Sequence, residues 1–329
     1  MNIIDAARRF SSEESALDYL ENLRWPDGVR CLMCGGNRIS KYNSRTNRKD
    51  RKTGAVKPGP LRYLYECLEP TCKHQFTATT GTIFHDTHLP LEKWLLAVAL
   101  MVNAKKGLSA KQVQRDLDVS YQTAWYLCHR IREAMGLQGV PTARFTGEVE
   151  ADETYIGGKY DKRRKRERWD KEPVFGIVER GGKVRTWHIP EVNRFHIIKK
   201  LRDNISIEAK VYTDESQMYK RMPNNIKSHE IVNHSEKEWV RGDVHTGTID
   251  GYWGLFKRGL IGSFHQVSVK HLQRYLDEFQ FRWNNRDSQD IFTLVVMALL
   301  IGKALQYKTL TAKVSEPALP SSDEPDEPF

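Results

Sequence analysis

The stretch GEVEADETYIGG, residues Gly147–Gly158, contains the first of three acids around which the C-terminal half of this chain is organised. Its alternating apolar and polar residues predict a strand that carries Asp152. Asp214, in KVYTDESQMY, follows a second such run, and Asp250, in HTGTIDGYWGLFKRG, lies in a segment with helical spacing. Carboxylates on two strands and one helix are the oxygen ligands that two Mg²⁺ ions need for phosphoryl transfer. Any one of these acids alone would more simply be a solvated surface group.

The segment around Asp250 has a second face opposite its apolar stripe. Asp250 and Lys257 are seven residues apart, which is close to two helical turns, so we expect both on that face. Gly254 stands between them and leaves the face without a side chain. A bare strip between an acid and a lysine suits a phosphate backbone that approaches a metal site.

Further strands and helices are predicted around these three segments. Strands are expected at Glu148–Ile156, Val174–Glu179, Val184–Pro190, Lys210–Thr213 and near Glu230–Asn233, and helices at Phe195–Asn204, around Asp250, at Val269–Trp283 and at Asp290–Tyr307. Three strands followed by a helix, a strand and more helices predict a mixed sheet covered by helices, an α/β architecture. The order in which the strands pair does not follow from one sequence.

Four of the five cysteines form two close pairs. Cys31 and Cys34 make CLMC, and Cys67 and Cys72 make CLEPTC, each where a tight turn is expected. Two turns that each supply two thiolates, joined by hairpin strands, are typical of a zinc ribbon with tetrahedral Zn²⁺. We expect this zinc to be structural, because the thiolates of an unfolded chain gain their order from the metal. His74 is an alternative ligand.

Residues 89–140 are predicted to form a helix-turn-helix DNA-binding domain. Ser109 and Ser120 are each placed to cap a helix, with a short turn at residues 118–119 between the two helices. The second helix would read a major groove with its outward side chains. We expect these to be Gln122, Thr123, Tyr126, Arg130 and Arg132. A three-helix packing domain is the alternative.

The placement of positive charge favours a polyanionic partner. A formal net charge of +10 alone is weak support, but two stretches concentrate the cations. KRRKRER, at Lys162–Arg168, contains six cations and one acid, and Lys41–Arg62 contains eight cations and one acid. Mobile solvated loops are the alternative for both. Beside a metal-site candidate and a cysteine module, they favour nucleic acid.

No segment predicts a membrane location. The N-terminal MNIIDAARRF lacks the apolar core of a signal peptide, and the longest apolar runs, WLLAVALMV and IFTLVVMALLIG, are too short to span a bilayer. We therefore expect a cytoplasmic protein, in whose reducing compartment the cysteines form no disulfide framework. Residues 315–329, with five acids and four prolines, are expected to be a disordered acidic tail.

The order of these parts and several motifs resemble the bacterial insertion-sequence transposases of the ISXO-two-like kind, the IS fifteen-ninety-five family. The resemblance covers roughly residues 15–310 and depends on CLMC…CLEPTC, FTATTGTIFHDTHLPLEKW, ADETYIGGK, VYTDESQMY and HTGTIDGYWGLFKRGLIGSFHQVSVKHLQRYLDEFQFRWNNR. It implies an RNase-H-like fold with a triad of acids, here Asp152, Asp214 and Asp250, that holds two catalytic Mg²⁺ or Mn²⁺ ions. It also implies that Lys257 contacts DNA near the scissile phosphate.

The chain departs from this family at the third acid, where Glu or Asn is usual and Asp250 stands here. Aspartate keeps the charge, but its shorter reach requires a closer helix. Glu153 follows Asp152 on a predicted strand, so we expect its side chain on the opposite face of the sheet, outside the metal site. His245 either contacts the leaving group or caps the helix of Asp250.

With this resemblance, the sequence predicts a multidomain α/β protein that acts as a DNA transposase. Its expected parts are a zinc-ribbon region at 1–88, the helix-turn-helix at 89–140, the RNase-H-like catalytic domain at 146–310 and the acidic tail. The expected partners are double-stranded DNA, as terminal inverted repeats and as target, and further copies of the chain on nucleoid DNA. Metal-dependent cleavage and strand transfer would follow. The alternatives are an RNase-H-like nuclease without strand transfer and a catalytically inactive DNA-binding regulator.

Overall fold

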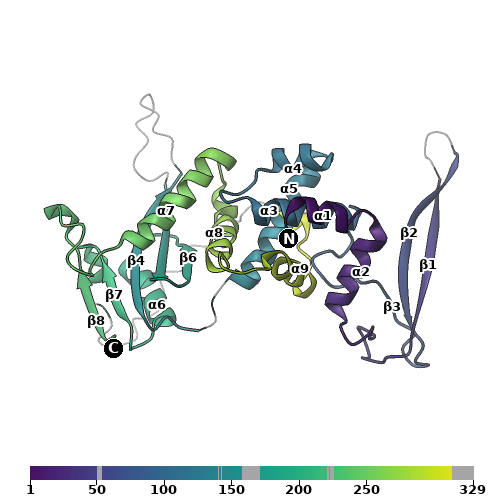
Figure 1. Cartoon of the computed structure of the whole chain (residues 1–329), viewed down its shortest axis with the longest axis horizontal. Coiled ribbons are helices and arrows are strands. Elements are labelled where there is room, and N and C mark those ends of the chain that lie inside the picture. The colour runs from purple at the N-terminus through teal and green to yellow at the C-terminus, as the bar shows by residue number, and fades with distance from the viewer. Residues whose placement is uncertain are drawn as a thin grey trace, which may run out of the picture.

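The computed structural model describes residues 1–49, 54–139, 141, 143–157, 171–220, 222 and 226–312. Along the long axis of Figure 1, a sheet with its helices occupies one end, a group of helices the middle, and a long hairpin the other end. The basic stretch Lys162–Arg168 and the expected tail at 315–329 lie outside the described residues, and Lys41–Arg62 is described only in part. Within the described residues, none of the helices has the length and apolar content that a bilayer crossing requires.

The N-terminal region contributes to two separate cores. Its elements are helices α1 (Ile3–Arg9) and α2 (Glu13–Arg24) and strands β1 (Ile39–Lys49), β2 (Val56–Cys67) and β3 (Gln75–Phe76). The strands form an antiparallel sheet in the order β1-β2-β3, with Tyr65 and Phe76 stacked in a small core beside the cysteines. Helices α1 and α2 pack instead into the central helical core through side chains such as Phe10 and Leu20.

Two of the three central helices begin where the capping residues indicate. The three helices are α3 (Leu91–Asn103), α4 (Ala110–Leu117) and α5 (Tyr121–Gly139). Ser109 Oγ accepts a hydrogen bond from the Gln112 N–H, and Ser120 Oγ accepts one from the Thr123 N–H. Between these two helices Asp118 has a left-handed φ of 48°, which turns the chain sharply. The capping serines and the turn were predicted and are confirmed.

A C-terminal helix completes the same core. The sequence predicts one helix at Asp290–Tyr307, whereas the structure has α9 (Ile291–Ile301) and a separate short α10 (Tyr307–Thr311). Gly302 ends α9 at a close contact, because a Cβ there would lie 2.5 Å from the Ile83 side chain. Helix α9 packs against α2, α3 and α5 in the central core. The catalytic domain expected at 146–310 therefore contributes one helix, α9, to the central helical core and other helices to the core on the sheet.

The remaining elements form a five-stranded mixed sheet with helices on both faces. They are β4 (Glu148–Ile156), β5 (Glu172–Glu179), β6 (Val184–His188), α6 (Arg194–Asn204), β7 (Lys210–Thr213), β8 (Ser228–Ile231), α7 (Gly247–Gly259) and α8 (Val269–Asn284). The strand order is β6-β5-β4-β7-β8, with β4, β5 and β6 antiparallel and β7 and β8 parallel to β4. Helix α6 packs on one face, and α7 and α8 on the other. The mixed α/β sheet is confirmed.

Candidate active site

Asp152 lies in the middle of the central strand β4 and faces helix α7. In the antiparallel register of β4 and β5, Asp152 is opposite Gly176, and paired residues have their side chains on the same face. A Cβ on Gly176 would lie 2.6 Å from the Trp253 ring of α7. The glycine therefore lets α7 rest directly on the sheet beside Asp152.

Asp214 directly follows β7, the parallel neighbour of β4. The register pairs Glu150 with Tyr212, so Asp152 and Asp214 each lie two residues beyond this pair on neighbouring segments. The Ser216 N–H donates to Asp214 Oδ1 at 3.0 Å, which orients this carboxylate. Two of the three predicted acids are thus neighbours on adjacent chain segments.

Asp250 occupies the first turn of α7, where Thr246 Oγ1 donates to its Oδ2 at 3.2 Å. Burial, and then the negative charges of Glu153, Asp250 and Asp214, raise the pKa of Asp152 to about 8. Burial also raises the pKa of Asp214, and the charge of Asp250 contributes. Each of the three predicted acids is therefore within electrostatic range of the other two.

The three acids do not converge as closely as the four cysteines do. In the described part of the chain, the four cysteines are the only group of three or more ligand residues whose donor atoms converge closely enough for one ion. The acids are more widely spaced, as expected for like charges that repel. Hard oxygen donors with uncompensated negative charge are what Mg²⁺ or Mn²⁺ would stabilise.

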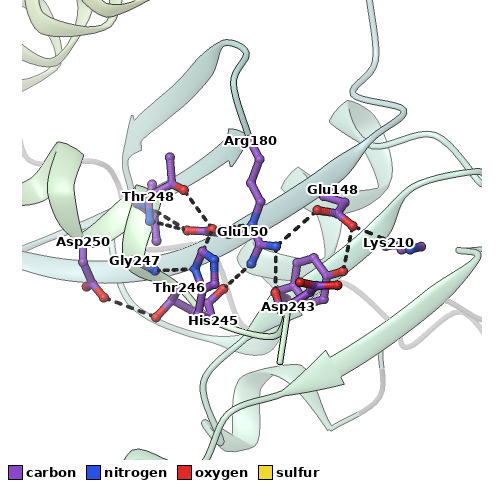
Figure 2. A network of polar contacts seen from close by, with 12 residues as sticks. Glu148, Glu150, Arg180, Lys210, Asp243, His245, Thr246, Gly247, Thr248 and Asp250 are labelled. Carbon is purple, nitrogen blue, oxygen red and sulfur yellow. Dashed lines mark hydrogen bonds and ion pairs between the residues drawn. The ribbon is translucent and has the colours of Figure 1, made fainter. Parts of the chain in front are cut away.

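Glu150, two residues before Asp152 on the same face of β4, holds the start of α7. Its side chain is fully buried and accepts hydrogen bonds from the N–H groups of Thr248 at 2.7 Å and Ile249 at 3.0 Å (Figure 2). These N–H groups of a first helical turn have no partner within the helix, and the helix dipole favours a negative charge there. One carboxylate thus fastens the helix of Asp250 to the strand of Asp152.

Arg180 supplies the positive charge beside the buried Glu150. Its Nε donates to Glu150 at 2.7 Å, and its Nη1 donates to Glu148 at 3.2 Å. The same guanidinium donates to the carbonyl oxygens of Asp243 and His245, at 2.7 and 2.9 Å, in the segment that leads into α7 (Figure 2). Arg180 therefore joins β4 to the entry of α7, and the buried charge is paired.

Sequence reasoning assigned no role to Glu150 or Arg180. The alternation of β4 does place Glu150 on the same face as Asp152, which was the available signal. Its partner could not be identified in that way, because Arg180 is thirty residues further along the chain.

Glu153 and Lys257 lie as the sequence suggests. Glu153 accepts a hydrogen bond from the hydroxyl of Tyr219, a buried residue of the core on the α6 side. Its side chain is therefore on the face opposite Asp152, as predicted. Lys257 is exposed on α7, two turns after Asp250.

His245 lies at the entry to α7. Its Nδ1 is 3.2 Å from the N–H of Gly247, from which it accepts a hydrogen bond, and 3.3 Å from Glu150 Oε1. Of the two roles left open for His245, these contacts favour the one at the start of the helix.

The four predicted zinc ligands converge at the base of the hairpin. Their Sγ atoms all lie within 4.8 Å of one another, and the Cys31–Cys72 and Cys34–Cys67 distances are both 3.6 Å. Sulfurs arranged tetrahedrally at about 2.3 Å from Zn²⁺ stand about 3.8 Å apart, so the group fits this ion. His74 is not part of the group and stacks on Phe76.

Three of the five side chains expected on the outer face of α5 are turned inward. Arg130 is 4% exposed and Arg132 is 2% exposed, and the hydroxyl of the half-buried Tyr126 donates to a backbone carbonyl of the core. The prediction that both arginines face outward to read DNA was wrong. Helices α8 and α9 pack along α5 and cover its later turns. Only Gln122 and the partly exposed Thr123 remain outside as predicted.

Comparison with known proteins gives two family matches and two relatives. Residues 144–284 match the family model of the ISXO2-like transposase domain, and residues 11–75 match that of the transposase zinc-ribbon domain. An uncharacterized protein in transposable element ISH50 of Halobacterium salinarum is 29% identical over 293 residues, which are 84% of this chain and 92% of that protein. An uncharacterized transposase-like protein of Haemophilus influenzae is 28% identical over 105 residues, which are 32% of this chain and 84% of that protein.

Two solved structures have weak similarity to the chain. The first is a pre-cleavage Mos1 transpososome, with 12% identity and a TM-score of 0.25, in a comparison that covers 64% of this chain and 79% of that chain. The second is a Mos1 transposase paired-end complex with left transposon end, with 12% identity and a TM-score of 0.24, in a comparison that covers 62% of this chain and 78% of that chain. TM-scores this low do not indicate a shared fold. The two family matches together cover more than half of the chain, and they agree with the relative from a transposable element. Residues 144–284 therefore belong to the family of ISXO2-like transposase domains, and residues 11–75 to the family of transposase zinc-ribbon domains.

Proposed function

We propose that this protein cleaves the ends of a transposable element and joins them to target DNA by metal-dependent phosphoryl transfer. The observation that carries the proposal is the placement of Asp152, Asp214 and Asp250 on three elements that pack together, namely β4, the end of its parallel neighbour β7, and α7, which lies on the sheet. Asp152, between the other two, would contact both ions, and Asp214 and Asp250 would each hold one. When bound, two such ions would supply an activated oxygen nucleophile and neutralise the leaving oxygen.

The topology of the sheet supports an RNase-H-like assignment for the catalytic domain. Three antiparallel strands are followed by two strands parallel to the first, in the order β6-β5-β4-β7-β8. The three acids lie on the central strand, directly after its parallel neighbour, and on a helix that covers one face. This is the arrangement that the family resemblance implies for a triad of acids.

The exposed face of α7 is suited to a DNA backbone. Asp250 and Lys257 are two turns apart, and both are exposed. Between them, a Cβ on Gly254 would have the flexible Arg258 side chain as its nearest neighbour, so the helix surface there is open. We assign to Lys257 the contact with a phosphate next to the metal site, because a lysine acts as a point charge toward phosphate.

End recognition is assigned to the helix-turn-helix and the zinc ribbon. Helices α4 and α5 have the capped starts and the short turn of that motif, with Gln122 and Thr123 at the outer first turn of α5. The first turns of a recognition helix are those that contact base edges. The ribbon, held by its cysteines, would add contacts through its hairpin.

The test uses the full-length zinc-loaded protein with a labelled duplex that carries one end of the element, a supercoiled target plasmid and Mg²⁺. We expect nicked end DNA and a labelled product joined to the plasmid, both abolished by EDTA. Cleavage without joining would instead identify a nuclease. Binding without cleavage would identify a DNA-binding regulator and would contradict the proposal.

A further inference from the structure

Arg130 and Arg132 are both buried in α5, but their charges are compensated differently. Arg132 Nε donates to Glu278 at 2.6 Å, in a group that also includes Arg282. No carboxylate among the described residues forms an ion pair with Arg130. Its Nη2 donates to the carbonyl of His85 at 3.1 Å, and its Nε is buried without a partner. Buried charges in proteins are normally paired or bound to a ligand.

Arg130 lines a pocket of about 290 Å³ beside the first turn of α5, together with Gln122 and Thr123. That volume corresponds to roughly ten molecules of liquid water, which is more than one phosphate group requires. The guanidinium carbon of Arg130 is 4.8 Å from the ring centroid of Trp94 and 5.0 Å from that of Tyr126. These two rings hold the cation in a defined position at the pocket wall.

We propose that Arg130 binds a phosphate of the DNA backbone in this pocket. The inference rests on the proposed function, in which α4 and α5 dock on DNA. Phosphates flank the groove that a recognition helix enters, so a pocket next to Gln122 and Thr123 would face the backbone. A guanidinium presents planar N–H donors that match phosphate oxygens. Such a contact fixes the position of the helix without reading the base sequence.

One acid in the same pocket acts against a bound anion. Asp86 lines the pocket, its side chain is 89% exposed, and its carboxylate is 3.6 Å from His85 Nε2. Burial lowers the pKa of Arg130, and the charge of Asp86 acts in the opposite direction without forming an ion pair. Removing the charge of Asp86 should therefore strengthen phosphate binding, which is the opposite of the effect expected when the charge of Arg130 is removed.

The experiment compares Arg130→Met with Arg132→Met in the full-length protein. Binding to a duplex with an element end and to a random duplex of equal length is measured over a series of KCl concentrations. Arg130→Met should weaken binding to both duplexes alike, by about tenfold. It should also make the slope of log K against log salt shallower by about one, because one phosphate contact is lost. Its Tm should be unchanged or higher, whereas Arg132→Met should lower the Tm by roughly 5 °C and leave the slope unchanged.

An unchanged affinity and slope in folded Arg130→Met would overturn the inference. A wild type that binds neither duplex would contradict the proposed function instead. If Arg130→Met does not fold, Arg130→Lys and Asp86→Asn take its place. Arg130→Lys should keep the slope with weaker binding, and Asp86→Asn should bind both duplexes more tightly. Wild-type affinity in these two variants would also overturn the inference.

Discussion

At the scale of single residues, the contact between α5 and α8 contains a histidine in an unusual state. His129 is fully buried, and both of its ring nitrogens lack hydrogen-bond partners. The rings of Trp125 and His271 are 4.4 and 4.5 Å away. Burial, and then the positive charge of Arg132, lower the pKa of His129 from 6.5 to about 2. The folded protein therefore keeps this ring neutral.

Acid should destabilise the fold through His129. Below pH 6.5 the unfolded chain binds a proton that the folded chain does not bind, so the stability from this site is complete above pH 6.5 and is lost as the pH falls. At pH 5 the loss should be about 2 kcal/mol. Urea unfolding at neutral pH and at pH 5 should show a smaller decrease for His129→Phe than for wild type. An exposed-site control, His88→Gln, should behave like wild type. Equal acid sensitivity in His129→Phe would show that the histidine is not responsible.

At the scale of secondary-structure elements, the placement of α7 decides the geometry of the site. Glu150 bonds the N–H groups of its first turn, Arg180 bonds the segment before it, and Gly176 makes room for Trp253 beneath it. These contacts act through the helix rather than on a substrate. We therefore regard Glu150 and Arg180 as positioning residues for Asp250.

Replacing Glu150 by Gln should impair cleavage more than DNA binding. The neutral side chain leaves Arg180 without its buried counter-charge and weakens the cap of α7, at a cost of roughly 2 kcal/mol. The Mg²⁺ concentration for half-maximal cleavage should rise, because Asp250 is less well placed. Glu148→Gln is the matched control, since Glu148 also bonds Arg180 but is 38% exposed. A Glu150→Gln protein with lower stability but the wild-type Mg²⁺ requirement would reduce the role of Glu150 to folding alone.

Substitutions at two glycines test independently whether α7 packs directly on the sheet. Gly176→Ala should lower stability by about 1–3 kcal/mol, because its Cβ would lie 2.6 Å from Trp253 and would push the helix away. Gly251→Ala should instead raise stability by about 0.5–1 kcal/mol, since a Cβ there has no atom within 4 Å and alanine favours a helix. Thermal unfolding of both variants measures the difference. Equal stability of the two variants would mean that α7 does not pack closely against β5 at Gly176.

Strands and helices could be predicted from the sequence where one local pattern determined them. The strand β4 alternates, α4 and α5 have capping serines, and the cysteine pairs have ligand spacing. The predictions that failed concerned residues whose packing partners are distant in the sequence. Arg132 was expected outside because arginine is polar, yet it is buried beside Glu278, which is 146 residues away. The apolar run of α9 indicated a buried helix but not which core would contain it.

At the scale of the whole molecule, the protein has separate cores held in different ways. The central helices combine α1 near the start of the chain with α9 near its end, and Phe10 stacks on Phe292 at 5.8 Å. The ribbon has only a small core beside its cysteines. Zinc should therefore stabilise the ribbon and leave the other parts folded.

Loss of one thiolate should unfold the ribbon selectively. Cys34→Ser should bind less than one Zn²⁺ per chain and should bind element ends more weakly, because metal binding supplies the folding free energy of this part. Cys128→Ser is the control, since Cys128 is buried in the helical core and is not part of the cysteine group. Metal analysis and gel shift measure both effects. Full end binding by a zinc-free protein would show that the ribbon does not depend on the metal.

The central claim is that three acids from separate elements form one metal-dependent catalytic site. The most direct measurement is cleavage of a labelled end duplex with Mg²⁺ or Mn²⁺ by Asp152→Asn, Asp214→Asn and Asp250→Ala, with DNA binding checked by gel shift. A carboxamide has nearly the same shape as a carboxylate but no charge to hold a divalent ion, and alanine has no oxygen ligand at all, so each variant should bind DNA and fail to cleave it. Glu153→Gln should retain most activity, because its side chain contacts Tyr219 on the other face of the sheet. Full cleavage by Asp250→Ala would contradict the account.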